Sequence, residues 1–182
     1  MNDGSGFNVL QMQLRARSNV DTAHHWNFAR WAPIPLRLIV GYGFAAHGYA
    51  KLLKGPDNFV AIVHAIGVPA PFIMAWATII LELLCGVAVL VGAFVPLVSV
   101  PMAAILLVAI FTVHVPFGFT SIKLMAVTPS GPQFGPPGYE CDLLYLACLA
   151  ALVLAGSGPW SLDSILGKRW RSLWSAKSVT RF

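Results

Sequence analysis

The fold is decided by residues 83–113, LLCGVAVLVGAFVPLVSVPMAAILLVAIFTV, which contain no Asp, Glu, Lys or Arg. As one helix this stretch would be about 45 Å long, whereas the hydrocarbon core of a bilayer is about 30 Å thick. Gly92 and Pro96 lie near its middle and favour a turn there. The sequence therefore predicts two membrane helices, near residues 70–92 and 96–115.

The composition of the whole chain also indicates a membrane protein. Hydrophobic residues make up 57% of the sequence and charged residues only 10%, whereas a soluble domain carries about a quarter of its residues as charged types. The net charge is +5, but the basic residues lie mainly at the two ends, outside the apolar segments. We therefore expect the lipid bilayer as a partner and no binding of nucleic acid.

Two further spans are predicted on either side of the central pair. One runs from about residue 35 to 53 and contains His47 and Lys51, and the other runs from about 139 to 155 and ends at the Gly- and Pro-containing segment 156–159. Polar residues are tolerated in a span when they face the interior of a bundle. The predicted fold class is all-α, an integral membrane four-helix bundle.

The two longer loops differ in character. Residues 55–69 (GPDNFVAIVHAIGVP) carry apolar side chains at helical spacing, which predicts a short amphipathic helix on the outer interface, between spans 1 and 2. Residues 116–138 are rich in Gly and Pro, which predicts a lid over the mouth of the bundle without regular secondary structure.

The distribution of Lys and Arg predicts the orientation. The two ends and the turn at 92–96 hold nine of them, whereas the longer loops together with Lys51 hold three. The positive-inside rule then predicts that both termini are cytoplasmic. We expect the protein in the inner (plasma) membrane of a bacterium. Arg37 lies near the inner boundary, where we expect it to be a snorkelling anchor. The predicted organisation is a basic N-terminal tail at 1–32, a four-span membrane domain at 33–163 and a basic C-terminal tail at 164–182.

The cysteines and histidines do not form a metal-binding pattern. Cys85, Cys141 and Cys148 make no CxxC, and the histidines make no HxxxH or ExxH. His47 and His114 together with a carboxylate could in principle ligate a metal, but their spacing gives no support for a metal site. No nucleotide fingerprint or nucleophile elbow is present in the sequence.

Glu82 is the clearest candidate for chemistry. It lies about 12 residues into the second span, near the middle of the membrane, where an unpaired charge costs several kcal/mol. One interpretation is a proton-accepting carboxylate with a raised pKa. The other is a hydrogen bond that holds two helices together, and the sequence leaves both open.

Other ionisable side chains gather in the outer half of the predicted bundle. They come from three spans: His47, Lys51, His114, Glu140 and Asp142. His47 and Lys51 are four residues apart and share a helix face. Because opposite charges offset part of each other's desolvation cost, we predict that Lys51 or His47 lies within hydrogen-bonding or water-bridged reach of Glu140 or Glu82. The pocket should open beneath loop 116–138.

Several short motifs occur in a recognisable order. They are RLIVG at 37–41, HGYAKL at 47–52, GVP at 67–69, ELLCG at 82–86, LVG at 90–92, Glu140 with LY at 144–145, and GPWSLD at 158–163. Together they resemble the DoxX family of small four-helix membrane proteins over about residues 35–163. Two features depart from the family pattern: the segment 125–138 is longer than usual, and the basic tails are long.

The resemblance implies a link to quinone chemistry. Family members are associated with thiosulfate:quinone oxidoreductase or terminal quinol oxidase activity, or with thiol and quinone stress. By resemblance, the polar site for proton transfer comprises His47, Lys51, Glu82 and Glu140. We expect His47 to exchange the proton, Glu82 to relay it and Lys51 to stabilise the anionic reduced form. We expect the quinone pocket to include Tyr49, His114 and Tyr145.

The leading hypothesis is a membrane subunit of a quinone-linked oxidoreductase, with membrane quinone as cofactor and a protein partner in a larger complex. The alternative is a non-catalytic membrane anchor or scaffold subunit. Whether the chain is itself an enzyme stays open at this stage. A transporter is disfavoured, because four spans without a repeat leave little room for alternating access.

Overall fold

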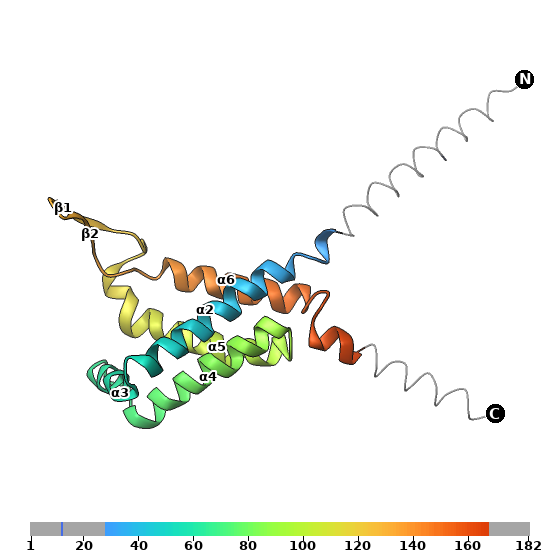
Figure 1. Ribbon diagram of the computed structural model, residues 1–182, viewed down its shortest axis with the longest axis horizontal. Coiled ribbons are helices and arrows are strands. Elements are labelled where there is room, and N and C mark those ends of the chain that lie inside the picture. Colours follow the sequence, from blue (N-terminus) through green and yellow to red (C-terminus); the bar gives the residue numbers. More distant parts are fainter. Residues whose placement is uncertain (1–11, 13–27, 168–182) are drawn as a thin grey trace, which may run out of the picture. The chain divides into compact units, whose positions relative to one another are not determined.

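The computed structural model describes residue 12 and residues 28–167, so the predicted basic tails lie almost entirely outside the described residues. Figure 1 shows the arrangement of the elements. The helices are α2 (Pro33–Leu53), α3 (Pro56–Ala65), α4 (Pro71–Val91), α5 (Val95–Ala109), the π-helical turn η1 (Ile110–His114), the 3-10 turn η2 (Val115–Phe117) and α6 (Glu140–Ala155); the strands are β1 (Leu124–Thr128) and β2 (Gly131–Phe134).

The central apolar stretch forms two membrane-length helices, as predicted. Within the described residues, Pro71–Val91 and Val95–Phe117 are long and apolar enough to cross a bilayer. They are separated at Gly92, which has a φ of 68°. This left-handed conformation favours glycine. Pro lies in the first turn of both helices, where its missing N–H would have no helical partner.

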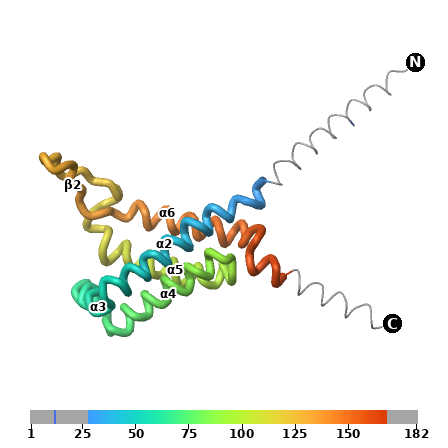
Figure 2. Tube along the Cα trace, viewed as in Figure 1, coloured from blue at the N-terminus to red at the C-terminus, as the bar shows by residue number. Residues whose placement is uncertain are grey.

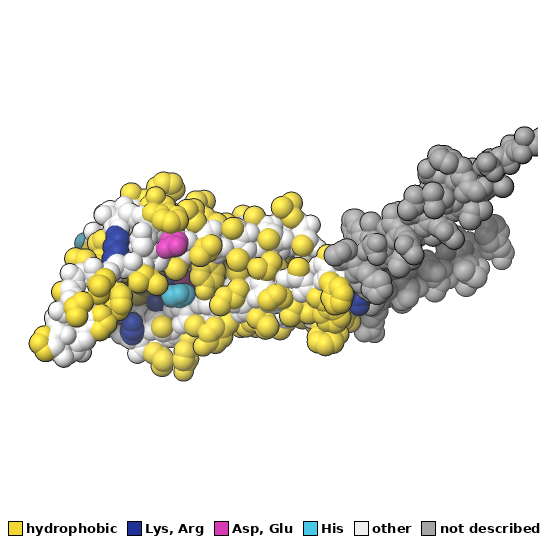
Figure 3. Space-filling view, turned by 90° about the horizontal axis from the view of Figure 1, so that it is seen from above, with side chains coloured by type: hydrophobic (Ala, Val, Ile, Leu, Met, Phe, Trp, Pro, Cys, Tyr) yellow, Lys and Arg dark blue, Asp and Glu magenta, His cyan; other side chains and the backbone are white. Residues whose placement is uncertain are grey.

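The helices α2, α4, α5 and α6 lie side by side, and each packs against two of the others (Figures 1 and 2). The helix α3 packs across α4 and touches the end of α2. Fully buried side chains at the centre include Val40, Val89, Met102 and Leu152. Outward-facing side chains such as Leu154 are also apolar, and Figure 3 shows hydrophobic side chains distributed along the length of the face in view. Such an exterior suits lipid.

The closest helix contact joins α2 and α4 through glycine. A Cβ atom on Gly86 would lie 2.6 Å from the backbone nitrogen of Ala45, and one on Gly41 would lie 2.7 Å from the carbonyl oxygen of Gly86. About one turn after Ala45 on α2, a Cβ on Gly48 would lie 3.0 Å from the Cβ of Glu82 on α4. Small residues at these positions therefore allow the two backbones to approach closely, as is common between helices in membranes.

The prediction that Arg37 is a snorkelling anchor is wrong. Arg37 is only 5% exposed. Its guanidinium donates hydrogen bonds of 2.7–3.4 Å to the carbonyl oxygens of Val89, Leu90, Ser157, Pro159 and Trp160. The carbonyls at the end of α4 have no partner within the helix, and the planar guanidinium supplies five donors. Arg37 thus ties α2 to the ends of α4 and α6.

Asp163 provides the cap for α5 from a distant part of the chain. Its carboxylate accepts hydrogen bonds from the N–H groups of Phe94 at 2.8 Å and Val95 at 3.4 Å, and from the hydroxyl of Ser157 at 2.7 Å. Burial raises the pKa of Asp163, but these hydrogen bonds and the charge of Arg37 outweigh burial, so the pKa lies below its usual value. The carboxylate is therefore stabilised in its charged form.

The prediction that residues 116–138 lack regular secondary structure is wrong. The strands β1 and β2 pair antiparallel, with Thr128 opposite Gly131 at the turn. The Thr128 hydroxyl donates to the carbonyl of Gly131 at 2.9 Å, which stabilises this turn. The sequence LMAVT favours a strand, and the Pro-Pro pair at 136–137 follows the hairpin instead of interrupting it. The fold is mostly helical with a small two-stranded sheet.

The hydrogen bonds that Asp163 accepts at the start of α5 predict how the stability of the protein changes with pH. At neutral pH, Asp163→Asn should lower the free energy of unfolding by about 1–3 kcal/mol, because it replaces a charged acceptor. The folded pKa is depressed, so this contribution is present above the usual value of about 4 and is lost as the pH falls through the folded pKa. Thermal unfolding in detergent should therefore show the wild type and Asp163→Asn converging below about pH 4.

The matched control for this experiment is Asp57→Asn, which changes an exposed aspartate in the first turn of α3. It should alter stability by less than about 0.5 kcal/mol. A gap between wild type and Asp163→Asn that stayed constant down to acid pH would contradict the proposed cap.

Candidate functional site

The site contains an ion pair between α2 and α4. Lys51 Nζ lies 2.5 Å from both Oε1 and Oε2 of Glu82, and the two side chains are 23% and 6% exposed. The sequence predicted that Lys51 or His47 would lie within reach of Glu140 or Glu82, and the Lys51–Glu82 contact confirms this geometry. Lys51 Nζ also lies 4.6 Å from the centroid of the Phe59 ring in α3, a cation–π contact.

A second pair of ionisable side chains lies between η1 and α6. His114 Nδ1 is 2.5 Å from Oδ2 of Asp142, which is buried in the first turn of α6. His114 is the last residue of the π-helical turn η1. A π-helical turn accommodates an extra residue and so changes the face on which the following side chains lie. Pro116, two residues later, has no N–H to continue an α-helix.

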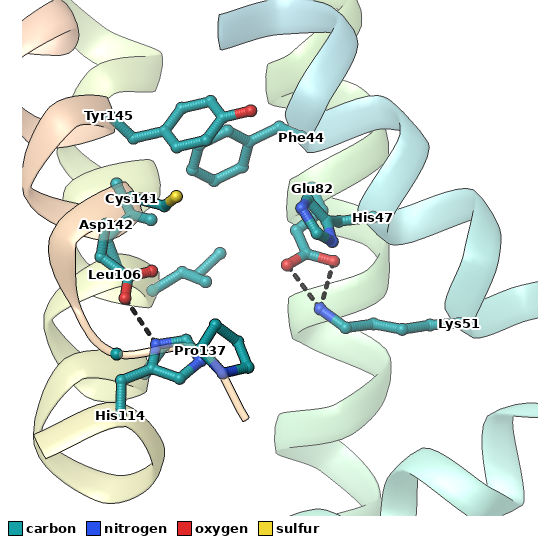
Figure 4. A pocket seen from close by; sticks show the side chains of 13 residues that line it. Phe44, His47, Lys51, Glu82, Leu106, His114, Pro137, Cys141, Asp142 and Tyr145 are labelled. Atoms are coloured by element: carbon teal, nitrogen blue, oxygen red, sulfur yellow. Dashed lines mark hydrogen bonds and ion pairs between the residues drawn. The ribbon is translucent and has the colours of Figure 1, made fainter. Parts of the chain in front are cut away.

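A cavity of about 500 Å³ separates the two pairs. Figure 4 shows Lys51, Glu82 and His47 on one side of it and His114 with Asp142 on the other. Much of its remaining wall is apolar and includes Phe44, Ile105, Leu106, Ala109 and Pro137. Pro137 comes from the segment between the hairpin and α6, so the cavity lies beneath that loop. It thus combines apolar walls with ionisable groups at opposite sides.

Three of the expected site residues line this cavity in addition to the ion pair: His47, His114 and Tyr145. The Tyr145 ring packs edge to face on Phe44, with 5.8 Å between the ring centroids. Gly43 makes room for Tyr145, because a Cβ there would collide with the Tyr145 hydroxyl. Tyr49, in contrast, is 57% exposed and is not among the residues lining the cavity.

Glu140 is also placed elsewhere. Its Oε2 accepts a hydrogen bond from the Ser121 N–H at 3.0 Å, and its own N–H donates to the carbonyl of Phe119 at 3.0 Å. These hydrogen bonds of Glu140 hold the loop at Phe119 and Ser121 against the start of α6. Successive helical residues are about 100° apart, so Glu140 and Asp142 differ by about 200°. They cannot face the same cavity, and Asp142 is the acidic residue that does.

Several residues of the site were not among those expected from the sequence. Phe44 lies three and seven residues before His47 and Lys51, and this helical spacing could have identified it. Cys141 also lines the cavity. Phe59 was recognised only as part of an amphipathic helix, because no sequence signal indicates which cation lies over an aromatic ring. The role of Asp142 depends on the rotation of α6, which its sequence does not reveal.

Comparison with known proteins agrees with the membrane character of the chain. The DoxX family model matches residues 32–115. An uncharacterized membrane protein of Mycobacterium tuberculosis, Rv3486, is 32% identical over 147 residues, which cover 75% of this chain and 82% of that protein. The chain belongs to the DoxX family. No solved structure matches it.

The DoxX match covers three of the four residues in the Lys51–Glu82 and His114–Asp142 pairs. Lys51, Glu82 and His114 fall inside residues 32–115, whereas Asp142 in α6 lies beyond them. The M. tuberculosis relative is described only as a membrane protein. The chain is therefore a DoxX-family membrane protein, and these two matches do not describe the chemistry of its site.

The ion pair leads to a stability prediction. Lys51→Met should lower the free energy of unfolding by about 3–5 kcal/mol, because it leaves the buried Glu82 carboxylate without its cation. The double variant Lys51→Met/Glu82→Leu should recover most of this loss, since no buried charge then remains. Lys54→Met changes an exposed lysine at the end of the same segment and serves as the matched control. Chemical unfolding in detergent measures these variants, the single variant Glu82→Leu and the wild type. A loss in the double variant equal to the sum of the two single losses would contradict the pairing.

Proposed function

We propose that this chain is a four-span protein of the bacterial inner membrane whose cavity binds the ring of a membrane quinone, as a subunit of a quinone-linked oxidoreductase. The observation that carries this proposal is the cavity with apolar walls and one pair of ionisable side chains on each of two sides. An apolar pocket with a few convergent polar groups is the usual form of a small-molecule site, and a volume of about 300–1,000 Å³ is typical.

The packing of α2 and α6 supports four spans. Both helices lie alongside the two membrane-length helices, and α2 has the same 21 residues as α4. Three of the ionisable groups that lower the hydropathy of α2 and α6 are buried or partly buried and engaged with another element: Arg37, Lys51 and Asp142. Inward-facing, paired charges are the form in which membrane spans tolerate such residues.

The cavity fits a quinone ring chemically. When bound, a quinone accepts two electrons and two protons, one proton at each of its two oxygens. His114, hydrogen-bonded to Asp142, and Lys51, paired with Glu82, place ionisable groups at opposite sides of the cavity. His47 is exposed and also lines the cavity, so it can exchange protons with the outside. Electrons come in this proposal from a partner protein.

A non-catalytic anchor or scaffold is the second candidate, and the hairpin favours it. Leu124, Met125, Val127 and Phe134 in β1 and β2 are between 58% and 77% exposed. Apolar side chains on a short projecting hairpin are typical of a surface that contacts another protein or the membrane. Quinone binding distinguishes the two candidates, because a scaffold has no need of it.

The proposed topology can be tested with reporter fusions. Fusions after residue 182 and in the turn at 92–96 should report a cytoplasmic position, because Lys and Arg are concentrated at the two ends of the chain. Fusions near Asn58 and Gln133 should report an external position. An external C-terminus would contradict four spans with a cytoplasmic N-terminus.

Binding of a tailless benzoquinone tests the proposed function. The purified protein in lipid nanodiscs should bind it, and His114→Ala and Asp142→Asn should each weaken binding by about tenfold or more, the equivalent of one charge-assisted hydrogen bond. Titration calorimetry measures the affinity, and thermal unfolding verifies that each variant is folded.

The matched controls for this experiment are His64→Ala and Asp57→Asn, which alter exposed residues of α3 that are not among the cavity-lining residues. They should bind the quinone as the wild type does. A wild-type protein that shows no binding would contradict the proposed site and favour the scaffold.

A further inference from the structure

A second cavity adjoins the first on the other side of the ion pair. It has a volume of about 360 Å³ and lies between α3, α4 and α5. Its walls are mostly apolar and include Phe59, Val63, Met74, Leu81, Ala104 and Val108. The two cavities share Lys51, Glu82, Ile105 and Ala109 as lining residues. The ion pair therefore lies where a polar chamber meets an apolar groove.

The helix α3 covers the groove and is linked to the ion pair. Its inner face contributes Phe59, Ile62 and Val63 to the groove wall. Phe59 is also the ring beneath the Lys51 ammonium. The segment is bounded by Gly55 and Gly67, which have φ angles of 91° and 78°. Glycine adopts these left-handed conformations without strain. A molecule bound beneath α3 would therefore contact Phe59 and Lys51, and Lys51 is the partner of the Glu82 carboxylate.

We propose that the groove beneath α3 holds the hydrocarbon tail of the same molecule whose ring occupies the polar cavity, and that this molecule enters sideways from the bilayer. The inference rests on the proposed function and extends it from a quinone ring to a lipid-soluble quinone with a long chain. The continuity of the two cavities at Lys51 and Glu82 carries it, because a ring with an attached chain is the shape that fills both.

The charge of the groove favours a neutral molecule over a phospholipid. Lys51 is the cation among its lining residues, and Glu82 already neutralises it. A phosphate would have to compete with that carboxylate in a low-dielectric site. The other polar lining side chains are Thr78 and Thr112. The groove therefore suits a single uncharged hydrocarbon chain.

The experiment compares two probes: a tailless benzoquinone and the same ring carrying a decyl chain. The wild type in nanodiscs should bind the decyl probe at least about tenfold more tightly. Ala104→Phe fills the groove at an exposed position of α5 and should abolish this advantage without changing the affinity for the tailless probe. Ala150→Phe makes the same change at an exposed position of α6 that is not among the groove's lining residues, and it should keep the advantage.

The remaining outcomes distinguish failure of the tail site from failure of the proposed quinone-binding function. If the tailless probe binds but the decyl chain adds nothing, or if Ala104→Phe and Ala150→Phe behave alike, the groove is not the tail site and the proposed function stands. If neither probe binds the wild type, the proposed function and the tail site both fail. If decylphosphocholine displaces the decyl quinone as effectively as unlabelled decyl quinone does, the groove is a general lipid site.

A second measurement does not depend on the variants. A decyl quinone with a photoreactive diazirine at the end of its chain should label peptides from α3 or α5 in the wild type, and excess unlabelled decyl quinone should suppress the labelling. Labelling spread over outward-facing positions of the other helices, such as Leu38 in α2 and Leu154 in α6, which are 56% and 87% exposed, would overturn the proposed tail site.

Discussion

The arrangement of this protein depends on the close contact between α2 and α4. Gly41, Ala45 and Gly48 on α2 meet Gly86 and the neighbouring turn of α4 at distances that leave no room for larger side chains. Dispersion forces and shape fit hold helices together in lipid, where the hydrophobic effect does not act between them. Because the contact fixes the rotation and height of α2, it places Lys51 opposite Glu82 and Arg37 opposite the end of α4.

The two cations of α2 are held in different ways because their surroundings differ. Arg37 meets backbone carbonyls left unpaired where α4 and α6 end, and its five donors suit several acceptors at once. Lys51 meets a single carboxylate in the interior and forms a compact pair with it. The Arg37 hydrogen bonds join the ends of α4 and α6 to α2. The Lys51–Glu82 pair instead lines a cavity, and for this reason we propose that the cavity is the functional site.

The sequence allowed the central helices and the ion pair to be predicted, but not the faces of the outer elements. The stretch 83–113 is too long for one span, so the turn near Gly92 followed from bilayer thickness. A carboxylate at mid-membrane requires a partner, and the sequence predicts Lys51 or His47 within reach of Glu82 or Glu140. The structure shows which of these pairs forms, Lys51 with Glu82. The family resemblance predicts Glu140 and Tyr49 in the site, yet helix rotation turns both away. The hairpin was missed because Gly and Pro were counted across 116–138 without separating the LMAVT strand from the Pro-Pro that follows it.

The central claim is that the glycine contact positions the ion pair. It is tested by measuring the coupling energy between Lys51 and Glu82, with a double-mutant cycle in three backgrounds: wild type, Gly86→Ala and Val87→Ile. Gly86→Ala adds one carbon between the helices, and Val87→Ile adds one carbon on the exposed face of α4. We predict that Gly86→Ala reduces the coupling by at least about 1 kcal/mol and that Val87→Ile leaves it unchanged. Equal coupling energies in all three backgrounds would contradict the account.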